Sequence, residues 1–154
     1  MKCAISDTVE YVKRMAQDLA GCEPNYAMVA ILLDLTFPTN YDGFEYLKNA
    51  TLLQFEDPSL DLVNDIYCRT GVKYGNIGPD VVASAIRRAT AIAWERGNTE
   101  IWNIYLPTVL TNDEHPPTNV EVITGLARIL ELWYGCSQAY LRQQLKEVVS
   151  SGRA

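Results

Sequence analysis

The chain has 154 residues, of which 48% are hydrophobic and 21% are charged, and its net charge is −6 at pH 7. This composition excludes wholesale disorder and predicts one folded domain of ordinary size. The longest apolar run, residues 28–33, is too short to cross a bilayer, and the N-terminus has no apolar signal-peptide core. We therefore expect a cytoplasmic protein that does not contact a membrane.

The chain is predicted to be all-helical. Apolar residues recur at helical spacing, glycines and prolines separate the segments, and no alternating strand pattern is present. The first expected helix spans 5–19, with Ser6 or Asp7 as its cap and Gly21 after its end. One side of this helix carries an apolar stripe of Ile5, Val9, Val12, Ala16 and Leu19.

Three more helices are expected before the middle of the chain. A short apolar helix over 26–35 is closed by Pro38, and a helix over 41–54 follows it. The third has Pro58 in its first turn and stops at Gly71, since proline favours the first turn and glycine favours the end of a helix.

The second half of the chain begins with the turn VKYGNIGPD. A helix over 79–96 follows, and a short helix over 98–105 comes after it. Beyond the loop LPTVLTNDEHPPT, a helix capped by Thr118 or Asn119 is expected to run to Trp133. Gly135 is expected to interrupt that helix. The last helix is expected over 136–149.

The helix pair over 58–96 has the form of a helix-turn-helix, although its turn is longer than the usual three or four residues. A helical wheel of its second helix separates two faces. The apolar face holds Val82, Ala85, Ile86, Ala89 and Ala93. The opposite face holds Asp80, Ser84, Arg87, Arg88, Ala91 and Glu95. Outward arginines suit phosphates and guanine edges, but from spacing alone a solvated face with surface salt bridges is the more common explanation.

The charge of the chain is unevenly distributed. Residues 31–68 hold seven acidic side chains and one basic side chain, whereas residues 69–96 hold five basic and two acidic ones. Nucleic-acid binding requires a local positive potential. The helix over 79–96 therefore lies in the one positive block of an acidic chain.

Four blocks of the sequence occur in a recognisable order: LLDLTFPTNYDGFEYLKNA, DLVNDIYCRTGVKYG, SAIRRATAIAWERGN and HPPTNVEVITGLARIL. Together, over roughly 29–133, they resemble the C-terminal DNA-binding effector domain of the sporulation initiation master response regulator, the stage 0 sporulation protein A family. The resemblance implies a six-helix domain whose recognition helix, 79–96, enters the major groove of a double-stranded promoter element. It also implies binding in tandem pairs, contact with RNA polymerase sigma factors, and DNA contacts from Arg87 and Arg88.

The combined prediction is an all-α fold of six to eight helices that contains a helix-turn-helix. Residues 29–134 form the effector-like domain, 1–28 add an N-terminal amphipathic helix, and 135–154 add a C-terminal helix and tail. The two added helices are expected either to pack on each other or to form a homodimer interface. The 28 residues before the resemblance are too few for the receiver domain of the family, so we expect no control by receiver phosphorylation.

The recognition helix departs from the family at positions 81, 83 and 84, where the family has arginine, glutamate and arginine. This chain has Val81, Ala83 and Ser84. Valine and alanine cannot form bidentate hydrogen bonds with base edges, although they can touch a thymine methyl group. The resemblance therefore implies altered or relaxed base specificity.

Two functions remain open. The first is a DNA-binding transcriptional regulator, with phosphate contacts from Arg69, Lys73, Arg87, Arg88 and Arg96 and a base or phosphate contact from Ser84. The second is a relative that no longer binds DNA and acts as a protein-interaction module on a sigma factor or a full-length regulator. The acidic block and the added helices favour that alternative.

An enzyme is not expected, because no nucleophile is paired with a base and no phosphate-binding glycine loop is present. His115, the only histidine, lies in a proline-rich loop. Three acidic residues with helical spacing, namely Asp57, Asp61 and Asp65, favour a solvated face over a cation site. The cysteines are expected to be free and mostly buried: Cys3, Cys22, Cys68 and Cys136. We expect no cofactor and no metal.

Overall fold

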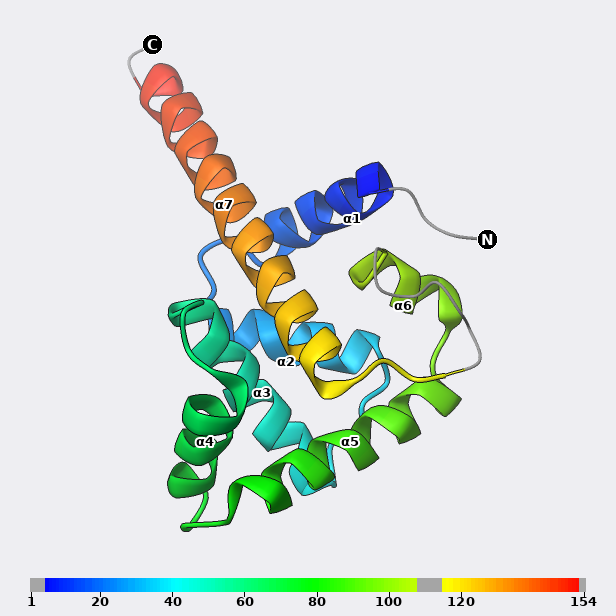
Figure 1. The fold of residues 1–154 in the computed structure, drawn as a ribbon. Coiled ribbons are helices and arrows are strands. Elements are labelled where there is room, and N and C mark those ends of the chain that lie inside the picture. The colour runs from blue at the N-terminus through cyan, green and yellow to red at the C-terminus, as the bar shows by residue number, and fades with distance from the viewer. Residues whose placement is uncertain (1–4, 108–114, 153–154) are drawn as a thin grey trace.

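The computed structural model describes residues 5–107 and 115–152, and these residues form helices and no strands (Figure 1). The elements are α1 (Ile5–Asp18), α2 (Pro24–Asp34), α3 (Asp42–Glu56), the π-helical segment η1 (Leu62–Tyr67), α4 (Cys68–Lys73), α5 (Pro79–Arg96), α6 (Thr99–Tyr105) and α7 (Asn119–Ser151). The predicted all-α fold is confirmed. Within the described ranges, no helix has the length and apolar character that a membrane span requires.

The core is organised around α3 and α7. Helix α3 packs against both α5 and α7, and α1 packs along α7 and against α6. Most of the largest fully buried side chains come from these elements and from α2: Met28, Ile31, Leu32, Leu47, Ile86, Trp102, Ile123, Leu126 and Trp133. Trp94 is half-buried, and its ring packs edge-on against Trp102 with the centroids 5.5 Å apart. These tryptophans therefore serve packing.

Helix α1 is integrated into the core by one carboxylate as well as by apolar contacts. The hydroxyls of Tyr11 in α1 and Tyr105 in α6 both donate to Oδ2 of Asp34 in α2. Burial, together with the Asp34 carboxylate, raises the pKa of both tyrosines, so both remain protonated donors. Helix α1 also packs against α6 and along α7, the helix that contains the added C-terminal segment.

The beginning of α1 differs from the prediction. The helix starts at Ile5, so Ser6 and Asp7 lie in its first turn and do not precede it. Ile5 is exposed, whereas Thr8, Val12 and Ala16 are buried. The buried side of the helix is therefore rotated away from Ile5.

The helix expected from Pro58 to Gly71 is also different. It begins at Leu62, because the Asp61 carboxylate accepts a hydrogen bond from the backbone N–H of Asn64 at 2.8 Å and caps the π-helical segment η1. Gly71 is buried inside α4 and does not end it. Asp57, Asp61 and Asp65 therefore do not share one helix face: Asp57 follows the end of α3, and Asp61 precedes η1.

Helix α7 runs without a break through Gly135, so the predicted interruption is wrong. A glycine inside a helix costs only about 1 kcal/mol relative to alanine, and burial of Trp133 and Ser137 on either side of it favours continuation. The predicted boundary between 134 and 135 consequently falls inside one helix. Thr118 caps α7 in a reciprocal capping box with Glu121.

The three cysteines in the described residues are free, as expected, but they are half-buried and not fully buried: Cys22, Cys68 and Cys136. Cys3 lies outside the described residues.

Helix α5 is held against α3 by a close contact at Gly43. A Cβ atom on Gly43 would lie 2.2 Å from the carbonyl oxygen of Ala85 and 2.8 Å from the Cβ of Ala89. No side chain fits that space, so the glycine permits α5 to approach the backbone of α3. This contact sets the position of the helix that carries the paired arginines.

We predict that Gly43→Ala lowers the free energy of unfolding by about 1–3 kcal/mol, because the added methyl group overpacks the α3–α5 contact. Urea denaturation measures this loss. Gly135→Ala is the matched control: nothing lies within 4 Å of the position of its Cβ, so this change should stabilise the protein by about 0.5–1 kcal/mol. Equal stability of the wild type and Gly43→Ala would contradict the close contact.

Candidate nucleic-acid interface

Helix α4, the turn over 74–78 and helix α5 form the predicted helix-turn-helix. The turn needs two residues in the left-handed region, Gly75 at φ 100° and Asn76 at φ 62°. The backbone N–H of Ile77 donates to the carbonyl of Gly71 at 2.9 Å, and a Cβ on Gly71 would lie 2.1 Å from the oxygen of Ile77. The turn therefore folds back onto α4 and places Pro79 at the start of α5.

The two predicted faces of α5 are confirmed. The buried residues are Val82, Ile86, Ala89, Thr90 and Ala93, while Ala85 is half-buried beside Gly43. The exposed residues include Asp80, Val81, Ser84, Arg87, Arg88 and Glu95. The arginines thus extend from the solvent side of a helix whose other side lies in the core.

Neither Arg87 nor Arg88 has a carboxylate oxygen within 4.0 Å in the described part of the chain. Their guanidinium groups are therefore not used in an internal ion pair. A guanidinium group that is exposed and unpaired can bind a phosphate through two parallel hydrogen bonds.

The surface next to Arg88 also contains negative charge. Ser84 and Arg88 line a shallow pocket of about 270 Å³ together with Asp42 and Asp80. Burial and the charge of Asp42 raise the pKa of Tyr46, which lines the same pocket. The two carboxylates weaken the positive potential of Arg88 and disfavour phosphates that approach from the side of Ser84.

The structure does not bring all the predicted contact residues together. Lys73 Nζ donates to Asn49 Oδ1 at 3.1 Å and lies 5.7 Å from the ring centroid of Tyr74, so its ammonium group is held against α3. Arg69 lies on α4. The pKa of Asp57 is lowered mainly by hydrogen bonds that Ser59 donates to its carboxylate, and the positive charge of Arg69 lowers this pKa further.

Arg96 occupies the last turn of α5. Ser84, Arg87 and Arg88 are therefore the predicted residues that share the central part of the recognition helix.

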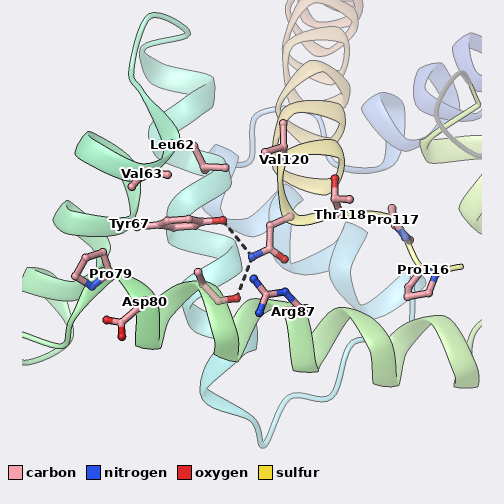
Figure 2. A pocket seen from close by; sticks show the side chains of 12 residues that line it. Leu62, Val63, Tyr67, Pro79, Asp80, Arg87, Pro116, Pro117, Thr118 and Val120 are labelled. Carbon is pink, nitrogen blue, oxygen red and sulfur yellow. Dashed lines mark hydrogen bonds between the residues drawn. The ribbon is translucent and has the colours of Figure 1, made fainter.

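On the other side of Arg87 lies a larger pocket that the sequence did not reveal (Figure 2). Its volume is about 690 Å³, and its lining comes from η1, the first half of α5 and the start of α7. Asn119 Nδ2 donates to the Tyr67 hydroxyl at 3.1 Å and to the carbonyl of Ala83 at 2.9 Å. The sequence identified Asn119 only as an alternative cap, because nothing local indicates that its amide reaches two other helices.

In the described ranges, no three histidine, cysteine or acidic side chains lie close enough together to hold a metal ion. His115 is exposed at the edge of the described chain.

Comparison with protein families identifies a relationship for most of the chain. The family model described as "Sporulation initiation factor Spo0A C terminal" matches residues 28–130. The match covers more than half of the 154 residues. It includes the helix-turn-helix and the first part of α7.

Proposed function

The chain belongs to the family of sporulation initiation factor Spo0A C-terminal domains, which are DNA-binding regulators of sporulation, and we propose that its α5 still binds the DNA backbone while reading bases with altered or relaxed specificity. A catalytic role is not proposed, because the family is one of DNA-binding regulatory domains. The observation that carries the proposal is the pair Arg87 and Arg88, which are exposed on α5 and form no ion pair with the described residues.

The residues that would face the bases support a change of specificity. Val81 is 50% exposed on the first turns of α5 and offers only apolar contact, such as that with a thymine methyl group. Ser84 is exposed and can donate one hydrogen bond. Ala83 is half-buried and lines the larger pocket. Val81 and Ala83 cannot make, and Ser84 with its single hydroxyl donor does not supply, the bidentate contacts that distinguish one base pair from another by about 1–3 kcal/mol each.

Electrostatics should make the binding weak and salt-dependent. Asp42 and Asp80 lie beside Ser84 and Arg88, and the chain as a whole carries a net charge of −6. A small number of phosphate contacts releases few counterions and gives modest affinity at physiological salt.

A homodimer is proposed from the C-terminal half of α7, which projects beyond the rest of the fold (Figure 1). Five exposed apolar side chains lie in this part of α7, and one of them is Val149. The other four are spaced seven, four and three residues apart, and we call them the α7 apolar stripe: Tyr134, Leu141, Leu145 and Val148. This spacing is the heptad repeat by which two helices pair. A dimer would also carry two recognition helices, as binding in tandem requires.

The alternative function, a protein-interaction module, would use the same α7 apolar stripe as its binding surface. A helix of another protein, such as a sigma factor or a full-length regulator, could pair with it in place of a second copy. The choice of a sigma factor rests on the family resemblance alone.

We predict that Arg87→Gln and Arg88→Gln each weaken binding to a random-sequence duplex regardless of its sequence. Each should lower the slope of log K against log salt by about 0.9, because each removes one phosphate contact. Fluorescence anisotropy at about 50 and about 200 mM salt measures both effects. Arg128→Gln is the matched control. Arg128 is an exposed arginine of α7, and it lines a pocket to which neither α5 nor the turn over 74–78 contributes a residue. No binding by the wild type at low salt would refute DNA binding and favour the interaction module.

Base specificity has a separate test. Selection of bound sequences from a random duplex pool should enrich either no motif or one that differs from the family's site. Enrichment of the family's own site would contradict altered specificity while leaving DNA binding intact.

We predict that Leu145→Glu prevents self-association, because it introduces a charge at the centre of the α7 apolar stripe. Sedimentation equilibrium should show twice the chain mass of 17.3 kDa for the wild type and the chain mass for the variant. Gln143→Glu adds the same charge on the opposite side of the helix and should remain dimeric. A monomeric wild type at high concentration would rule out the homodimer.

A further inference from the structure

The pocket beside Arg87 has the size and character of a small-molecule site. Its volume of about 690 Å³ falls within the range of roughly 300–1,000 Å³ that is typical of such sites. Its walls are mainly apolar and include Leu62, Val63, Pro117 and Val120. Val63 and Val120 are 59% and 56% exposed, so apolar surface remains in contact with water at this place. Covering that surface would favour an occupant with an apolar body.

A buried hydrogen-bond acceptor in this pocket has no partner. Asn119 is only 9% exposed, and its Oδ1 accepts no hydrogen bond in the described residues. The orientation of the amide is fixed, because the carbonyl of Ala83 can only accept and therefore must face Nδ2. An unpaired buried acceptor costs about 1–3 kcal/mol, so a ligand that donates to Asn119 Oδ1 would gain affinity there.

Tyr67 offers the complementary group. Its hydroxyl oxygen accepts from Asn119 Nδ2, and no acceptor for its own proton is found among the described residues. Tyr67 is 6% exposed, so this proton is not freely solvated. Asn119 and Tyr67, which both line the pocket, therefore form a hydrogen-bonded pair with one acceptor and one donor that have no partner among the described residues.

Two side chains of opposite charge would orient a ligand in the pocket. Arg87 and Asp80 both line the pocket from α5, seven residues apart, which is about 10 Å along a helix. In Figure 2, Tyr67 from η1 and Arg87 from α5 point into the same part of the pocket, whereas Asp80 lies toward Pro79. An anionic group is thus attracted to the end with Arg87, Tyr67 and Asn119, and it is repelled from the other end.

We propose that this pocket binds a small apolar organic acid, with its anionic group on Arg87 and Tyr67 and a neighbouring hydrogen-bond donor on Asn119 Oδ1. The inference rests on the proposed function in one respect: Arg87 would otherwise bind a DNA phosphate. One guanidinium cannot serve both partners fully, so the acid and the DNA compete. The acid would then weaken DNA binding by the same factor by which DNA weakens acid binding.

The probe is 1-anilinonaphthalene-8-sulfonate, abbreviated ANS. It combines an apolar aromatic body, a secondary amine N–H and a sulfonate, and its fluorescence increases in apolar surroundings. Titration of the wild-type chain should show one saturable site. Arg87→Gln should weaken binding at this site about tenfold or more, and Tyr67→Phe about three- to tenfold, because each removes a hydrogen bond to the anion.

Arg88→Gln is the matched control. Arg88 is the neighbouring arginine but lines the pockets on the other side of α5, so this change should alter ANS affinity by less than about twofold while still weakening DNA binding. Leu145→Glu controls for ANS binding to the α7 apolar stripe and should leave the ANS binding that depends on Arg87 unchanged.

A second pocket variant tests the site even if Tyr67→Phe or Arg87→Gln fails to fold. Val120→Asp places a carboxylate at the pocket wall in the first turn of α7, where the helix dipole favours an acid and the fold should persist. It should weaken ANS binding at least about fivefold. Equal effects of Arg87→Gln and Arg88→Gln on ANS, or no effect of Tyr67→Phe and Val120→Asp, would overturn the site.

Displacement of ANS by duplex separates this inference from the proposed function. Excess duplex should release ANS from the wild type. If ANS shows the predicted dependence on Arg87 but no duplex binds, the acid site is supported and DNA binding fails. If duplex binds and ANS stays bound, the competition is overturned.

Discussion

The close approach of α3 and α5 at Gly43 is the contact on which the rest of the structure depends. The missing side chain lets the carbonyl of Ala85 come within 2.2 Å of the place where a Cβ would stand. Helix α5 buries Val82 and Ile86 completely on that side, so it cannot move outward without opening the core. Packing alone therefore decides that Arg87 and Arg88 face solvent, and at what place on the surface.

The two arginines are adjacent in sequence but have different surroundings. Arg88 shares a shallow pocket with Asp42 and Asp80, and those carboxylates weaken its attraction for phosphate. Arg87 borders an apolar pocket that is also lined by Asn119 and Tyr67, whose amide oxygen and hydroxyl proton have no partner in the described part of the chain. Because successive residues on a helix are rotated by about 100°, two neighbouring charges can serve two different ligands. Helix α5, which we propose to bind DNA, therefore also lines a separate apolar pocket.

Local signals predicted much of the fold and failed where long-range packing outweighed them. The bounds of the helix over 79–96 and its two faces were predicted correctly, because they follow from helical periodicity and from residues that favour helix ends. Gly71 and Gly135 look like helix ends but lie inside helices. Gly71 is needed where the turn comes back onto α4, and the burial of Trp133 and Ser137 outweighs the cost of Gly135.

The sequence by itself determined the all-α fold and the membership of the family, and it places Val81, Ala83 and Ser84 at the start of the helix that we propose to bind DNA. These properties follow from residue type and local spacing, which a single chain displays directly. Only the tertiary structure decided that Lys73 contacts Asn49, that α1 is joined to the core through Asp34, and that Asn119 and Tyr67 form a pocket with Arg87. Each of these contacts joins segments that are distant in sequence, so it depends on how the helices pack and not on any local pattern.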